Sequence, residues 1–92
     1  MPVAIHPGAI LREELEARGL SATRLALDLG VPPNRITGIL QGKRNITAET
    51  ALRLARYFGN SAHFWMALQI DYDLAVAERD KKKEIDRTVR AA

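Results

Sequence analysis

The segment from residue 29 to residue 48 carries three cations, Arg35, Lys43 and Arg44, and no acidic residue. Arginine, lysine and the amide side chains near them are the groups that hydrogen-bond phosphates and the edges of bases. Elsewhere acids and bases are more nearly balanced, and the formal net charge of the whole chain is +3. The positive charge is therefore local, as a nucleic-acid footprint would be, although a solvated basic loop would carry the same charge.

Residues that catalyse reactions or bind metals are scarce in this chain. Its 92 residues include no cysteine and two histidines, His6 and His63. Disulfides and cysteine-ligated zinc are therefore excluded, and the lack of cysteine fits a reducing cytoplasm. Ser61 and His63 are two residues apart, which is not the arrangement of an activated nucleophile, and there is no glycine-rich phosphate loop. We therefore expect no enzyme activity, no metal site and no cofactor.

Length and hydropathy predict one intracellular domain. With 47% hydrophobic residues, the chain can bury one small core. Its apolar runs are shorter than the roughly 18 residues of a membrane span, and its N-terminus lacks the order of a signal peptide. We expect a cytoplasmic protein with no membrane contact. Because a domain of this size is only marginally stable alone, pairing with a copy of itself would help.

Start and stop signals predict five helices. Proline and hydroxyl residues stand where helices can begin, and glycines or an amide stand where they can end. The five helices are bounded by His6-Pro7 and Gly19, by Ser21 and Gly30, by Pro33 and Gln41-Gly42, by Thr47 and Gly59, and by Ser61 and about Ala77. No segment alternates with period two, so the expected fold class is all-α. Residues 1–77 form the expected domain, with its fifth helix at 62–77, and residues 78–92 form a charged C-terminal extension that is either helical or disordered.

The second and third helices meet through a very short link, "LGVPP". So short a turn forces the two helices to cross steeply, which is the helix-turn-helix geometry. That geometry needs a small residue, a glycine and an apolar plug, and Ala26, Gly30 and Val31 supply them. Ile36 and Ile39 give the third helix its inner face. Residues 22–41 therefore predict a DNA-binding helix-turn-helix, with an ordinary helical hairpin as the alternative.

The third helix is expected to enter the major groove with its N-terminal end first. Asparagine and glutamine can pair with adenine, arginine with guanine, and proline or a threonine methyl can pack on a thymine methyl. The predicted base-contacting residues are Pro33, Asn34, Arg35, Thr37, Gly38 and Gln41. The predicted phosphate-contacting residues are Lys43, Arg44, Asn45, Thr47 and Thr23. Gly38 costs a helix about 1 kcal/mol relative to alanine, which indicates close backbone approach to DNA or to another helix, or simple tolerance.

Three further signatures carry a family resemblance over about residues 6–77. They are "HPG" at the start of the first helix, "GKRNIT" after the helix-turn-helix, and "SAHFWMALQIDYDL" in the fifth helix. The helix-turn-helix resembles the λ-repressor-like (XRE-type) family, and the three signatures resemble the HigA-type antitoxins, also described as virulence-associated protein I-like. Two positions depart from the λ-repressor-like pattern. Ala22 replaces a glutamine that braces a DNA contact, and Pro32-Pro33 removes a capping hydroxyl.

The resemblance implies a five-helix λ-repressor-like fold with a long C-terminal helix. It also implies a homodimer that represses its own operon at a palindromic DNA operator and neutralises a RelE-like messenger-RNA endonuclease toxin. A stand-alone repressor and a toxin-binding scaffold with weak DNA affinity are the alternatives. The basic tail has three alternatives: it binds toxin, wraps DNA or has no role. Because the surface of such a toxin is usually basic, the acidic first helix, with Glu13, Glu14 and Glu16, is the competing toxin surface, and its alternative is a solvated face.

The fifth helix holds most of the aromatic residues. Trp65 is expected in the core rather than as the anchor of a dimer. The predicted dimer interface consists of Phe64, Leu68, Tyr72 and Leu74. Gln69 and Asp71 are expected to cap or hydrogen-bond across that interface, or to be exposed to solvent. His6 is expected to cap the first helix.

Overall fold

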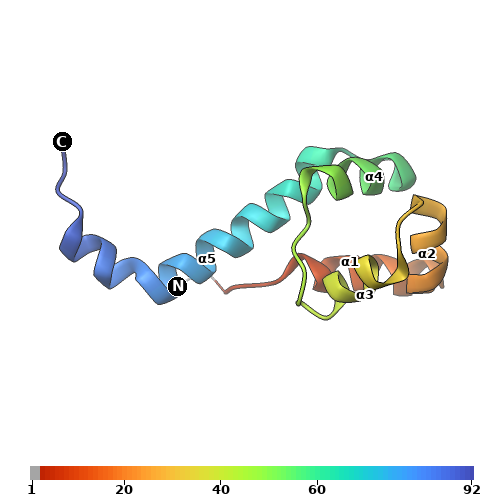
Figure 1. Cartoon of the computed structure of the whole chain (residues 1–92), viewed down its shortest axis with the longest axis horizontal. Helices are drawn as coiled ribbons and strands as arrows, with labels where there is room; N and C mark the ends of the chain where they lie inside the picture. The colour runs from red at the N-terminus through yellow and green to blue at the C-terminus, as the bar shows by residue number, and fades with distance from the viewer. Residues whose placement is uncertain (1–2) are drawn as a thin grey trace.

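The computed structural model describes residues 3–92, which form five helices and no strand (Figure 1). The helices are α1 (Pro7–Arg18), α2 (Ala22–Leu29), α3 (Pro33–Leu40), α4 (Ala48–Phe58) and α5 (Ala62–Thr88). Helices α1 to α4 and the first half of α5 pack together, and the second half of α5 projects from them, which gives the molecule a long dimension of 48 Å. The all-α, five-helix prediction is confirmed.

Four of the five helices begin with a side chain that accepts a backbone hydrogen bond. The hydroxyls of Ser21, Thr47 and Ser61 each accept from the N–H three residues further along. At α1 the Nδ1 atom of His6 accepts from the N–H of Gly8, with the two nitrogens 2.9 Å apart. These contacts satisfy N–H groups that a helix leaves unpaired at its start. The predicted caps, including His6, are confirmed.

The core gathers apolar side chains from all five helices around Trp65. Trp65 has no exposed surface, and Leu11, Leu25, Ile39 and Leu54 are equally buried. The indole Nε1–H of Trp65 donates to the side-chain oxygen of Asn60 at 2.9 Å, so its one polar group is satisfied. The prediction that Trp65 belongs to the core is therefore confirmed.

Helix α1 approaches α3 very closely near its start. A Cβ atom placed on Gly8 would collide with the backbone carbonyl of Ile39. Glycine at this position therefore lets the two helices touch, and the "HPG" signature is explained by a cap, a helix start and a close contact in three successive residues.

Helix α5 holds the loop between α3 and α4 through a buried amide. Gln69 is 3% exposed, and its Oε1 accepts a hydrogen bond from the N–H of Ile46 at 2.7 Å. Its Nε2 donates to Asp73 at 2.9 Å. The expectation that Gln69 bonds across a dimer interface or faces solvent is wrong, because the amide is used inside the chain to satisfy a loop N–H that has no helical partner.

The imidazole of His6 packs beneath the same loop. Its ring meets the ring of Tyr72 edge to face, with centroids 4.9 Å apart, and it also lies beside Gly42. Burial lowers the pKa of His6 below its ordinary value of 6.5, although the backbone of Arg44 and the carboxylate of Asp73 act in the opposite direction. The neutral ring is also the form whose Nδ1 can accept the bond from Gly8.

Helix α5 continues past Ala77 to Thr88, so the helical alternative for the charged extension is the one that the structure shows for residues 78–88. All residues from Ala77 to Ala92 are exposed. Ion pairs one turn apart line this part of the helix, including Lys82 with Asp86 at 3.4 Å and Lys81 with Glu84 at 3.9 Å. Such pairs support a helix only weakly when they are exposed.

Replacing Gln69 with leucine should lower the free energy of unfolding by about 1–3 kcal/mol, because the N–H of Ile46 would stay buried without an acceptor. Urea unfolding followed by circular dichroism measures this. Gln41→Leu, the same change at an exposed position, is the matched control and should be close to neutral. Equal stability of the two variants would contradict the role assigned to Gln69.

The free energy of unfolding should fall as the pH drops below about 6.5, the ordinary pKa of histidine. The unfolded chain binds a proton at His6 there, while the folded chain resists it until its lower pKa is reached. His6→Asn keeps a capping side chain but does not titrate. Urea titrations between pH 8 and pH 5 should show a smaller loss of stability for the variant, and parallel pH profiles would refute the assignment.

Candidate nucleic-acid interface

Helices α2 and α3 are joined by Gly30, Val31 and Pro32. Gly30 has a φ of 73°, in the left-handed region that favours glycine. The N–H of Val31 donates to the carbonyl of Ala26 at 3.0 Å, and the Val31 side chain is buried. Ala26 has no exposed surface, so α3 can pack closely across α2. The turn therefore meets each local requirement of a helix-turn-helix.

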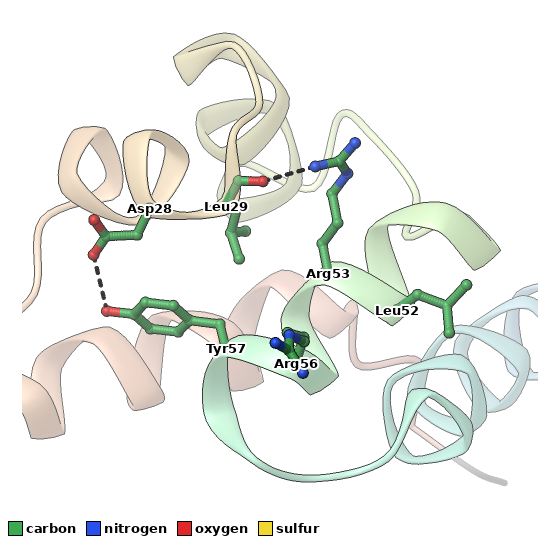
Figure 2. Close-up of a pocket in the computed structure, with 6 residues that line it drawn as sticks. All are labelled: Asp28, Leu29, Leu52, Arg53, Arg56 and Tyr57. Carbon is green, nitrogen blue, oxygen red and sulfur yellow. Dashed lines mark hydrogen bonds between the residues drawn. The ribbon is translucent and has the colours of Figure 1, made fainter.

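Helix α4 fixes the end of α2 just before that turn (Figure 2). The Nη1 of Arg53 donates to the carbonyl of Leu29 at 2.8 Å, and the hydroxyl of Tyr57 donates to Asp28 at 3.2 Å. These side chains line a groove of about 570 Å³ between α2 and α4. Arg53 satisfies one of the carbonyls that a helix leaves unpaired at its end. It was not among the residues predicted from sequence, because its contact is 24 residues away.

Helix α3 turns a polar face away from the core. Ile36 and Ile39 are fully buried and hold the helix on α1 and α2. The opposite face carries Pro33, Asn34 and Gln41, all exposed, together with the half-buried Thr37. These are four of the six predicted base-contacting residues, and helical spacing places them on one side.

Arg35 lies at the edge of this face and is already engaged. Its Nη1 is 3.2 Å from the Oε1 of Glu49, whose Oε2 is 3.2 Å from the Nη2 of Arg53. The hydrogen bond from Arg53 first, and the charge of Arg35 second, lower the pKa of Glu49 below its ordinary value. Glu49 therefore holds Arg35 beside the start of α4. No sequence pattern pointed to Glu49, because an acid in the first turn of a helix is ordinary and its partner Arg35 is 14 residues away.

Gly38, the sixth predicted residue, faces the side chain of Arg44. A Cβ atom on Gly38 would lie 3.2 Å from the Cβ of Arg44. The carbonyl of Gly38 also accepts hydrogen bonds from the N–H groups of Lys43 and Arg44, at 2.9 and 3.1 Å. Glycine at this position therefore lets the basic loop fold back onto α3. The close approach at Gly38 is a contact with the chain's own loop.

The loop from Gln41 to Ile46 exposes its polar side chains beside the outer face of α3. Lys43, Arg44 and Asn45 are exposed. Within residues 3–92, neither Lys43 nor Arg44 forms an ion pair. Two of the chain's fourteen lysines and arginines thus stand uncompensated next to the polar face of the helix-turn-helix.

The two threonines predicted to contact phosphates stand at the starts of α4 and α2. Thr47 is exposed, and its hydroxyl accepts from the N–H of Thr50 at 3.3 Å and also contacts the hydroxyl of Thr50. Thr23 is exposed in the first turn of α2. Ala22, where the λ-repressor-like pattern has a glutamine, packs against the core.

The four residues predicted for a dimer interface do not form one surface. Phe64 is 43% exposed and Leu74 is 63% exposed. Leu68 is half-buried against the core, and Tyr72 packs on His6. Leu74 lies on the opposite side of α5 from Tyr72, because two residues along a helix correspond to about 200°. The assignment of these four residues to a dimer interface stays a prediction.

Residues 3–92 contain no group of three or more histidine, aspartate and glutamate side chains placed to hold a metal ion. No helix in that range is both long and apolar enough to cross a membrane.

The chain is similar to known proteins over most of its length. The helix-turn-helix family matches residues 11–65. Virulence-associated protein I of Dichelobacter nodosus is 58% identical over 80 residues, which cover 86% of this chain and 74% of that protein.

Two solved structures share the whole fold. A HigA-family addiction module antidote protein of Coxiella burnetii is 47% identical, with a TM-score of 0.95 over 99% of this chain and 100% of that one. Antitoxin HigA of Pseudomonas aeruginosa, solved with the higBA promoter, is 42% identical, with a TM-score of 0.92 over 96% of this chain and 97% of that one. The family match, the sequence identity and the shared fold all indicate the same family. The chain belongs to the HigA-type antitoxins of the XRE helix-turn-helix family.

Proposed function

We propose that this chain is the DNA-binding antitoxin of a type II toxin–antitoxin system. It represses its own operon as a homodimer on a palindromic operator, and it neutralises a RelE-like messenger-RNA endonuclease toxin. The observation that carries the DNA-binding part is the polar outer face of α3 beside the uncompensated cations of the 41–46 loop. The promoter complex of the Pseudomonas aeruginosa HigA supports the same role.

Base recognition is assigned to the outer face of α3. Asn34 and Gln41 are exposed amides that can each pair with the two polar atoms of an adenine edge. Pro33 and the methyl group of Thr37 pack against thymine methyl groups. The hydroxyl of Thr37 already donates to the carbonyl of Pro33 at 3.3 Å, which leaves its methyl as the contacting group. Gly38 is assigned to packing of the loop instead of to base contact, because Arg44 covers it.

Arg35 is assigned to a guanine, with Glu49 as its positioning residue. An arginine that is held at one edge by a carboxylate loses less side-chain freedom when it binds a base. Because a guanidinium has five N–H donors, the contact with Glu49 through Nη1 leaves donors for the O6 and N7 of guanine.

Phosphate contacts are assigned to the residues around the recognition face. Lys43, Arg44 and Asn45 extend from the 41–46 loop, and Thr23 and Thr47 lie at helix starts, where free N–H groups favour anions. Because the hydroxyl of Thr47 already caps α4, its backbone and the following N–H groups are the contacting atoms. These contacts position the protein on the duplex without reading its sequence.

The chain should bind its own promoter DNA in preference to unrelated DNA of equal length. Fluorescence titration at several salt concentrations should give an affinity that falls steeply with salt, because cations displace counterions from phosphates. Added antitoxin should also restore translation in a cell-free extract inhibited by the toxin encoded beside it. Equal, weak binding to both DNAs would reject the repressor function, and continued inhibition of translation would reject the antitoxin function.

Arg35→Ala should cost about 1–3 kcal/mol of binding at one base pair of each half-site and relax the preference there. Lys43→Ala should weaken binding to all sequences alike and reduce the salt slope by about 1. Arg56→Ala and Lys83→Ala serve as controls. Each removes a residue of the same type, an arginine or a lysine, at an exposed position outside the proposed interface. Titration of single-base operator variants measures both effects. Unchanged operator affinity of Arg35→Ala would reject the assignment to guanine.

A further inference from the structure

Arg12 is a cation on α1 without an acidic partner. It is exposed, and within residues 3–92 it forms no ion pair. Glu16 lies one turn further along the helix, but an arginine four residues before an acid is the weaker order for such a pair. Arg18, the other arginine of α1, is paired with Glu14 at 3.2 Å. The charge of Arg12 is therefore free for a group outside the chain.

The side chain of Arg12 is held at the end of α3. Its Nη2 donates to the carbonyl of Leu40 at 3.3 Å. The carbonyls of Gly38 and Ile39 accept from N–H groups of the following loop, whereas Leu40 is left for a side chain. The carboxyl end of a helix also favours a cation. Because this bond uses one of the five guanidinium donors, the others remain for a further acceptor.

Arg12 lines a groove of about 430 Å³ between α1, the start of α2 and the end of α3. Glu16 is the acid among the lining residues, and most of the others are apolar or small: Leu15, Gly19, Leu20, Ser21, Ala22 and Leu40. Ala22 contributes only a methyl group, where the λ-repressor-like pattern has the longer glutamine. The groove is therefore open between the guanidinium and the start of α2.

Two sides of this groove adjoin the proposed DNA surface. Leu40 leads directly into the 41–46 loop with its uncompensated cations, and Ala22 is followed by Thr23, which is assigned to phosphate. The hydroxyl of Ser21 binds the N–H of Arg24 at 3.0 Å, so the earlier N–H groups of α2 have no partner within the helix. An anion in the groove would meet these N–H groups on one side and Arg12 on the other.

We propose that Arg12 binds a backbone phosphate of the DNA that enters this groove beside the start of α2. The carbonyl of Leu40 positions the guanidinium, which therefore loses less side-chain freedom on binding. The contact supplies from α1 the donor that a glutamine at position 22 would supply from α2. The inference deepens the proposed function and rests on it, because it adds α1 to the helices that hold the duplex.

Fluorescence titration of the full chain with promoter DNA and with unrelated DNA tests the contact. Arg12→Ala should raise the Kd for both DNAs severalfold and lower the salt slope by about 1 for each half-site bound. Arg12→Lys should keep the slope, because a lysine also carries a charge to a phosphate. Arg56→Ala, which removes an exposed arginine on α4, is the matched control and should change neither quantity.

Circular dichroism verifies that each variant stays folded. A role of Arg12 in capping α3 alone would lower stability and leave the salt slope unchanged. A folded Arg12→Ala chain with the affinity and the salt slope of the parent would overturn the proposal. Glu16→Gln should lower the Kd, because it removes the negative charge that lines the groove.

Uncharged methylphosphonates placed one at a time along a half-site locate the contacted phosphate. The parent should lose affinity at each contacted position, and Arg12→Ala should be insensitive at one of them. Ala22→Gln fills the groove and offers an amide at the same place, so Arg12→Ala should cost less affinity in that background. Equal sensitivity of parent and Arg12→Ala at every phosphate, or equal cost of Arg12→Ala in both backgrounds, would overturn the site.

The two DNAs separate this inference from the proposed function. A parent chain that prefers its promoter, with Arg12→Ala unchanged, retains the repressor function and overturns the Arg12 contact. A chain without preference for its promoter, in which Arg12→Ala still weakens binding to both DNAs and lowers the salt slope, supports the contact and rejects the repressor function. A parent chain that binds neither DNA rejects both.

Discussion

The hydrogen bond from the N–H of Ile46 to the buried amide oxygen of Gln69 determines how the basic loop sits on the bundle. Ile46 is itself 2% exposed and anchors the end of the loop in the core. The bond joins this anchor to α5, and α5 is in turn fixed by Trp65. At the other end, the N–H groups of Lys43 and Arg44 bind the carbonyl of Gly38. The cations therefore lie beside α3 because both ends of their loop are tied down.

A second set of contacts ties α4 to the helix-turn-helix. Glu49 lies between two arginines, one from α3 and one from α4, and Arg53 also binds the last carbonyl before the turn. Each exposed ion pair by itself contributes little to the stability of the fold. Together they link the recognition helix, the turn and the start of α4, and the position of Arg35 relative to the 41–46 loop follows from that link.

The structure presents two surfaces of different chemical character. Helices α2 to α4 and their loops present polar and cationic groups in an arrangement suited to a DNA groove. The outer half of α5 exposes Ile85 among charges of both signs. The first half of α5 connects them, because one side of it closes the core through Trp65 and Gln69 while the other carries Ile70 and Leu74.

The sequence by itself determined the helix starts and the turn, whereas the tertiary structure decided which side chains meet. Ser21, Thr47 and Ser61 act on N–H groups three residues away, and Gly30 acts on its own backbone, so the necessary information is local. Glu49 and Gln69 bind partners 14 and 23 residues away, which no local pattern reveals. The inward packing of Leu68 and Tyr72 depends likewise on the angle at which α5 crosses the bundle. Helix α5 continues past Ala77 because its charged sequence contains no glycine or proline to stop a helix, and ion pairs one turn apart support it.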